Sequence, residues 1–179
     1  GDRIDDQVYA DYTSSQVLIF KDSISNNINH ILYNNYKTGA GLLRGFIQGF
    51  LKASDVFDVV LLGKYLAQTD IWGSWHGRRW INMRFYYNPI TARLEPISFD
   101  NHLYSLKPFP ISKEFIINRF FEDKVLFLTF LQSLNQFNNK LTNQNYINFL
   151  KKENDRLFSQ LSKEFYMRRN DWTDIKQLL

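Results

Sequence analysis

The sequence contains no cysteine, and its 179 residues include only 4 prolines and 8 glycines. Without cysteine there is no disulfide framework, no thiolate metal site and no cysteine nucleophile, although the cellular compartment stays open. The low proline and glycine content excludes a collagen-like or low-complexity chain. No apolar run approaches the roughly 18 residues that span a membrane, so we expect no membrane-spanning segment.

The chain has only a small excess of positive charge, since 22 basic and 18 acidic residues give a net charge of +4. The densest basic pairs are Arg78-Arg79 and Arg168-Arg169, far short of the stripe that nucleic-acid-binding proteins show. We therefore expect no nucleic-acid partner. Aromatic residues, in contrast, are abundant. The 16 Phe and 10 Tyr residues predict a folded chain with a large core that is rich in aromatic rings.

The length predicts a single domain over residues 1–179. We divide it into a helical lead-in over 1–54, a segment over 55–104 that contains the candidate active site, and a helical bundle over 105–179. A longer protein is expected, because the chain begins with Gly rather than Met.

Helical spacing of apolar residues dominates the first third of the chain. The pattern predicts a helix that ends at Gly39 and a second helix over residues 42–51. Asp55 and Asp58 then provide a helix N-cap. The helix that follows, over 56–66, is apolar almost all round, which is typical of a central, buried helix.

A β-hairpin is predicted near residues 81–100, because the apolar period changes to two. The first strand covers 81–87, and a turn begins at Asn88. The second strand covers 94–99, where Pro96 favours an edge or bulge position.

The rest of the chain reads as helical. Ser112 is placed to cap a helix over 115–121, and Asp123 to cap one over 125–137. A further apolar stripe covers 146–165, and we expect the Phe-rich helices to form core. This order of elements predicts an α+β fold that is mostly α.

Most of the plausible chemistry lies around the hairpin. Asp70 follows the buried helix, Asn82 opens the hairpin and Asp100 ends it. In protein kinases one Asp near a helix end orients the acceptor hydroxyl, whereas an Asn and a second Asp hold the metal ions on the phosphates. The order of these three residues matches that arrangement, although H-R-D and D-F-G motifs are absent.

At these residues the chain resembles the CotH-type (spore-coat) atypical kinases. The resemblance covers roughly residues 55–104 and is carried by Tyr65-Leu66-Ala67, Asp70, Trp75-His76-Gly77, Asn82, Phe85-Tyr86-Tyr87-Asn88-Pro89 and Glu95-Pro96-Ile97-Ser98-Phe99-Asp100. One departure is that this chain has Ile97-Ser98-Phe99-Asp100-Asn101 where many members have a Trp-Asp-x-Asp type sequence. The second acidic ligand is therefore missing, and His102 stands where it would be expected.

The resemblance implies a protein-kinase-like C-terminal lobe that uses ATP with Mg²⁺ or Mn²⁺ and transfers phosphate to a protein substrate. It further implies a bacterial protein, at the cell surface or secreted in its full-length form, whose N-terminal lobe precedes this chain. Carried over residue by residue, the resemblance implies a catalytic Asp70 and metal-binding Asp100 and Asn82. From their positions around these residues, we further expect His76 to be catalytic and Arg78, Arg79 and His102 to contact phosphate or substrate.

Two other functions remain open from the sequence. A metal-dependent hydrolase would use His76, Asp100 and His102 with Asp70 as base. A non-catalytic, pseudokinase-like binding module would keep the fold without the chemistry. The residues also have structural interpretations, such as a hydrogen-bonded ring for His76 and a solvated surface charge for Arg78.

Overall fold

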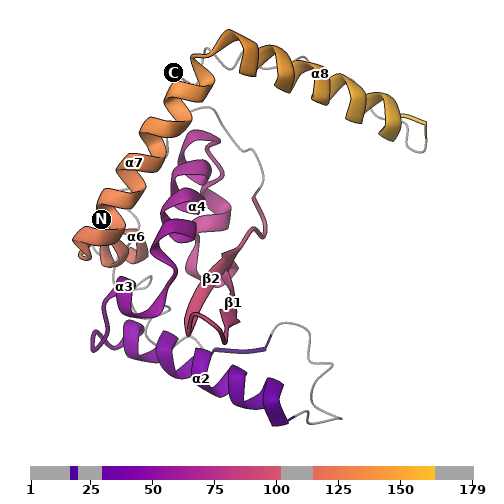
Figure 1. The fold of residues 1–179 in the computed structure, drawn as a ribbon. Helices are drawn as coiled ribbons and strands as arrows, with labels where there is room; N and C mark the ends of the chain where they lie inside the picture. Colours follow the sequence, from indigo (N-terminus) through magenta and orange to yellow (C-terminus); the bar gives the residue numbers. More distant parts are fainter. Residues whose placement is uncertain (1–16, 20–29, 102–114, 164–179) are drawn as a thin grey trace, which may run out of the picture. The chain divides into compact units, whose positions relative to one another are not determined.

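The structure is a computed structural model that describes residues 17–19, 30–101 and 115–163 (Figure 1). Its residues form two compact units, 1–133 and 134–179, and we describe each by itself. The expectation of a single domain over the whole chain stays a prediction. Some residues named above lie outside the described ranges: His102, Ser112, Phe165, Arg168 and Arg169.

The first helix that the structure describes in unit 1, α2, runs without interruption over His30–Ile47. The prediction that Gly39 ends a helix and that a second one covers 42–51 is therefore wrong. Gly39 is needed for packing instead, because a Cβ there would lie 3.1 Å from the Cβ of Tyr87. The chain leaves the helix near Gly49, whose φ of 83° suits glycine.

Two helices follow, α3 over Ala53–Val56 and α4 over Val59–Ile71. The predicted helix with its cap at Asp55 is corrected here, since Asp55 lies inside α3 and the cap of α4 is Asp58. Oδ1 of Asp58 accepts hydrogen bonds from the backbone N of Val60 at 3.0 Å and of Leu61 at 2.9 Å. The prediction that this helix is buried all round is wrong, because the side chains of Val60 and Leu61 are 50% and 40% exposed. Only the opposite face of α4, with Leu62 and Leu66, is buried.

The predicted hairpin is confirmed as a two-stranded antiparallel sheet. After the short helices α5 (Trp75–Arg78) and η1 (Trp80–Asn82), strand β1 covers Arg84–Asn88 and β2 covers Arg93–Ile97, with Phe85 opposite Pro96. The hairpin lies alongside α4 (Figure 1). The backbone N of Asp58 donates to the O of Leu94 at 2.9 Å, which ties β2 to the start of α4.

Aromatic rings fill the core of unit 1, as the composition predicts. The Phe46 ring lies 5.1 Å from that of Phe57 and 5.2 Å from that of Phe120. Phe57 also contacts Phe85 at 5.0 Å, so the core reaches the hairpin. Because such ring pairs contribute about 1 kcal/mol each beyond the apolar area that they bury, this cluster holds α2, α6 (Phe115–Phe121) and β1 together.

One carboxylate caps two helices of unit 1. Asp123 accepts from the backbone N of Val125 at 2.9 Å, which confirms the predicted cap of α7 (Lys124–Leu141). It also accepts from the backbone N of Ser54 in α3 at 2.7 Å. Burial raises the pKa of Asp123, but hydrogen bonds from Ser54, Val125 and Leu126 outweigh it and hold the pKa below the usual value.

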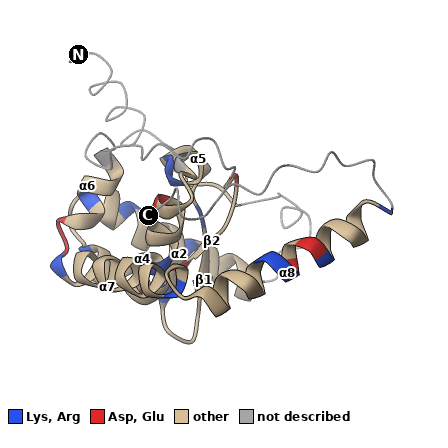
Figure 2. Cartoon of the chain, turned by 90° about the horizontal axis from the view of Figure 1, so that it is seen from above, with Lys and Arg blue, Asp and Glu red and all other residues tan. Residues whose placement is uncertain are grey.

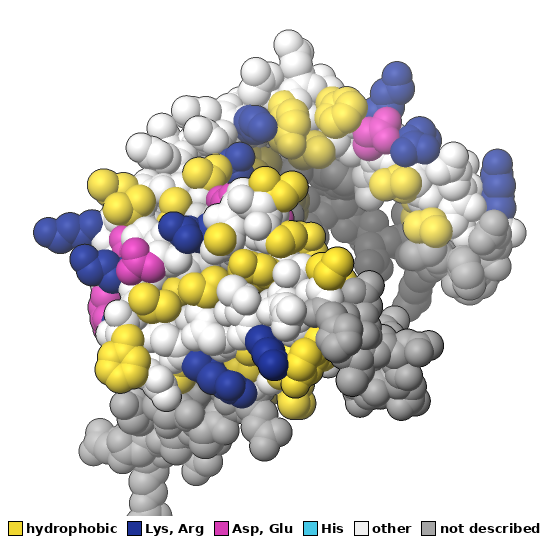
Figure 3. Space-filling model, turned by 60° about the horizontal axis from the view of Figure 1, so that its bottom comes forward, with side chains coloured by type: hydrophobic (Ala, Val, Ile, Leu, Met, Phe, Trp, Pro, Cys, Tyr) yellow, Lys and Arg dark blue, Asp and Glu magenta, His cyan; other side chains and the backbone are white. Residues whose placement is uncertain are grey.

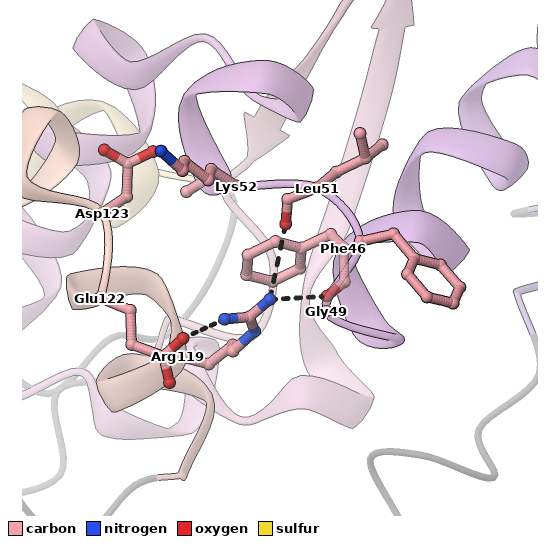
Figure 4. A pocket seen from close by; sticks show the side chains of 9 residues that line it. Phe46, Gly49, Leu51, Lys52, Arg119, Glu122 and Asp123 are labelled. Atoms are coloured by element: carbon pink, nitrogen blue, oxygen red, sulfur yellow. Dashed lines mark hydrogen bonds and ion pairs between the residues drawn. The ribbon is translucent and has the colours of Figure 1, made fainter.

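A cavity of about 280 Å³ lies beside this double cap (Figure 4). Arg119 reaches into it from α6, over the ring of Phe46, and pairs with Glu122. Its guanidinium also donates weakly to the backbone O of Phe46 at 3.4 Å and of Leu51 at 3.5 Å. Arg119 thus links α6 to the carboxyl end of α2, where a positive charge is favourable.

Unit 2 contains α8, which covers Gln144–Leu161 and begins at the N-cap Asn143. The prediction that the Phe-rich helices are core is wrong in part, since Phe149 in α8 is 55% exposed and Phe127 in α7 is 39% exposed. The described part of the chain is thus mostly helical with one hairpin, as expected for an α+β fold that is mostly α.

Figure 3 shows hydrophobic side chains on the surface, interspersed with Lys and Arg. Among the described helices, none combines the length and the apolar character that a membrane span requires.

Candidate functional site

The candidate site is built where α4 ends and the chain doubles back. Asp70 lies in the last turn of α4, and Gly73, with a φ of 59°, reverses the chain immediately afterwards. The backbone N of Ser74 returns to the O of Thr69 at 2.8 Å. This tight return fixes α5 beside the end of α4, so that residues 76–78 come back toward Asp70.

Asp70 forms an ion pair with Arg78. The guanidinium NH1 donates to Oδ1 of Asp70 at 2.8 Å. Arg78 is buried, with only 1% of its surface exposed, whereas the Asp70 side chain is 24% exposed. The pair therefore anchors the carboxylate from the protein side and leaves part of it open to solvent.

A second cluster forms around the carboxylate of Asp100. Its Oδ2 lies 2.8 Å from Nδ1 of His76 and accepts a hydrogen bond from Nδ2 of Asn82, also at 2.8 Å. The same Nδ2 donates to the backbone O of His76 at 3.1 Å. Three residues from α5, η1 and the end of the hairpin thus meet at one carboxylate, which is about one-quarter exposed.

The backbone at Asp100 is left-handed. Its φ is 53°, in the region that L residues other than Asn and Asp rarely adopt. Here the two contacts to its side chain, from His76 and Asn82, hold it from one side.

A buried tyrosine holds the neighbouring residues. Tyr65 donates its hydroxyl to the backbone O of Gly77 at 2.7 Å and lies 3.5 Å from Oδ1 of Asn101. Asn101 in turn donates Nδ2 to Oγ of Ser98 at 2.6 Å. Burial raises the pKa of Tyr65 to about 12, so the hydroxyl stays a donor at neutral pH.

The structure brings some of the predicted site residues together. Asn82 and Asp100 are in contact, as predicted for two ligands of one ion, and His76 joins them. Asp70 is engaged by Arg78 in a separate ion pair, so its approach to the same ion stays a prediction. The two arginines that were predicted to contact phosphate lie in different environments. Arg78 is buried in the ion pair with Asp70, whereas Arg79 is exposed.

Sequence reasoning missed the roles of Tyr65 and Asn101. Both belong to, or directly follow, the stretches that carry the family resemblance, and Gly77 is the sequence feature that could have revealed them. A glycine between two functional residues indicates a place where another group approaches the backbone closely.

The side chains around Asp100 include few groups that could hold a metal ion. Within 30–101 and 115–163, no group of three or more His, Asp or Glu side chains is arranged to hold a metal ion by itself. Asp100 supplies one carboxylate and Asn82 one amide oxygen. In this arrangement Asn82 turns its Nδ2, and not its oxygen, toward Asp100, so a metal at these two residues stays a prediction.

Comparison with protein-family models finds no matching family, and comparisons with curated proteins and with solved structures find no match either.

Proposed function

We propose that this chain is the C-terminal lobe of a CotH-like atypical kinase, which transfers phosphate from ATP to a protein substrate. The proposal rests on one observation above all: Asn82 and Asp100, 18 residues apart, meet at 2.8 Å at the end of a hairpin. In kinases an Asn and an Asp lie close together because both hold the metal ions on the phosphates.

Asp100 and Asn82 are the residues that we assign to Mg²⁺ or Mn²⁺. A bound ion neutralises charge on the phosphates and fixes their position. His76, whose Nδ1 contacts the same carboxylate oxygen, orients that carboxylate when the ion is absent.

Asp70 is the residue that we assign to the acceptor hydroxyl. Arg78 anchors its Oδ1, which sets the direction of Oδ2 and keeps the carboxylate from rotating. A positioned carboxylate of this kind accepts the proton of the acceptor hydroxyl. Arg78 then serves to position Asp70 rather than to contact phosphate directly.

The proposal requires an N-terminal lobe in a longer protein. Phosphate binding in kinases uses a strand lysine, and neither β1 nor β2, the strands of the described residues, carries one. We therefore expect negligible ATP turnover from this chain alone, and transfer when the lobe is present in the same polypeptide.

Transfer of radiolabelled phosphate from ATP, in the full-length protein with Mg²⁺ or Mn²⁺, tests the proposal. Asp100→Asn keeps the shape but removes a charged ligand, and Asp70→Ala removes the acceptor base, so each should reduce transfer by at least about 10³-fold. Asp58→Asn, at the cap of α4, is the matched control and should retain transfer. Full activity of Asp100→Asn, or hydrolysis that depends on Zn²⁺, would contradict the proposal.

A further inference from the structure

Tyr65 is a buried residue of α4 that reaches both sides of the candidate site. Its hydroxyl donates to the backbone O of Gly77 at 2.7 Å and lies 3.5 Å from Oδ1 of Asn101. Gly77 belongs to α5, whereas Asn101 follows the hairpin. Because only 8% of the Tyr65 surface is exposed, the core of unit 1 holds this side chain in place.

Gly77 lies between two residues of the candidate site. Nδ1 of His76, which precedes it, lies 2.8 Å from Oδ2 of Asp100. Arg78, which follows it, donates to Oδ1 of Asp70 at 2.8 Å. The basic end of α5 is visible in Figure 2. A shift of the backbone at Gly77 would move both side chains together, so the hydrogen bond to its carbonyl bears on both carboxylates.

Asn101 fixes the other side of the site, at the end of the hairpin. Its Oδ1 lies where a Cβ on Gly77 would be, at 1.6 Å from that position, and its Nδ2 donates to Oγ of Ser98 at 2.6 Å. The second bond closes the turn in which Asp100 lies. Because the Asn101 side chain is held at both ends, the backbone of Asp100 has little freedom to turn away from α5.

We propose that Tyr65 is a positioning residue of the candidate site. Through Gly77 and Asn101 it fixes α5 and the end of the hairpin against α4, and the carboxylate of Asp100 is thereby held relative to that of Asp70. Such placement matters for group transfer, because a displacement of about 1 Å can cost about 10²-fold in rate. The effect on phosphate transfer rests on the proposed function, whereas the placement itself can be measured in this chain without ATP.

The side-chain amide of Asn82 reports this placement. Its Nδ2 donates to Oδ2 of Asp100 at 2.8 Å and to the backbone O of His76 at 3.1 Å, and so senses both sides of the site. In NMR spectra of this chain, Tyr65→Phe should speed exchange of the two Asn82 amide protons with water about tenfold. Asp123→Asn, at the double cap of α3 and α7, is the matched control. It should cost a similar amount of stability and leave the Asn82 exchange unchanged.

Two variants test the same link from the hairpin side. Asn101→Ala should also speed the Asn82 exchange, and the double variant with Tyr65→Phe should add little, because the two residues act as one unit. Ser98 is exposed, so Ser98→Ala leaves the core intact and keeps the test open where Tyr65→Phe does not fold. It should speed the exchange about threefold, because it frees the Asn101 side chain. Full additivity, or equal effects from Asp123→Asn, would overturn the proposal.

Kinetics of the full-length protein test the consequence for transfer. Tyr65→Phe should lower kcat about tenfold and leave KM for ATP within about twofold, because the placement of the carboxylates changes and binding of the nucleotide does not. Asp123→Asn should keep the kcat of the unaltered protein. No transfer by the unaltered full-length protein would contradict the proposed function, whereas unchanged Asn82 exchange in Tyr65→Phe would overturn the role of Tyr65. An unchanged kcat in Tyr65→Phe, in a protein that transfers phosphate, would overturn it as well.

Discussion

Oδ1 of Asn101 occupies the space in which a side chain on Gly77 would lie, since a Cβ built there would be 1.6 Å from it. Tyr65 stands on the other side, with its hydroxyl 3.0 Å from the same Cβ position. The α5 backbone and the residue after Asp100 are therefore fitted together without room for a methyl group. Because Asp100 is covalently joined to Asn101, this fit also fixes the position of the Asp100 backbone relative to α5.

Gly77→Ala should destabilise the chain by about 1–3 kcal/mol, because Asn101 would have to leave its bond to Ser98. Chemical denaturation measures the loss. Gly41→Ala is the matched control, since a Cβ at Gly41 meets nothing within 4 Å. That variant should stabilise α2 by up to about 1 kcal/mol, and an equal loss from both variants would show that the fit at Gly77 is unimportant.

Tyr65→Phe should cost about 1–2 kcal/mol, because the buried O of Gly77 loses its donor. The pH dependence gives an independent check. Burial raises the pKa of Tyr65 to about 12 from its ordinary value of 10.0, so the hydroxyl keeps its proton to higher pH in the folded state than in the unfolded state. Stability is therefore full below about pH 10 and should fall as pH rises from 10 toward 12, a loss that Tyr65→Phe should reduce.

Arg78→Met should destabilise by about 3 kcal/mol, because Asp70 loses its buried partner. Arg78→Lys should not restore full stability, since an ammonium group does not reproduce the guanidinium geometry. Thermal unfolding measures both. Arg79→Met, at the exposed neighbour, is the comparison and should cost markedly less. In the full-length protein, Arg78→Lys should lower kcat more than it raises KM if Arg78 positions Asp70.

Asp123→Asn should cost about 1–2 kcal/mol at neutral pH, because the amide cannot accept from both Ser54 and Val125. The pKa of Asp123 is lower in the folded state, so its contribution is present above the unfolded pKa and is lost as pH falls through the folded pKa. Denaturation curves of the two proteins should thus converge in acid. Glu122→Gln, at an exposed neighbour, should change stability by less than about 1 kcal/mol.

Local patterns in the sequence were sufficient for several elements. The alternation over residues 81–87 and 94–99 predicts the hairpin, because side chains in a strand alternate whatever surrounds them. Asp123 is identified as a cap from its position before an apolar run. The order of Asn82 and Asp100 around the hairpin predicts their convergence, since a hairpin brings the flanks of its strands together.

Contacts between elements were decided by the tertiary structure alone. Gly39 was interpreted as a helix stop, but α2 continues through it. Glycine is needed there for packing, because Tyr87 of β1 lies where a Cβ would be crowded. The sequence places Arg78 in a candidate phosphate-binding loop, whereas packing of α5 against α4 buries it beside Asp70. Periodicity and capping depend on a few neighbouring residues, so the sequence by itself determines them. The partner of a buried side chain depends on how whole helices and strands pack, which only the folded chain decides.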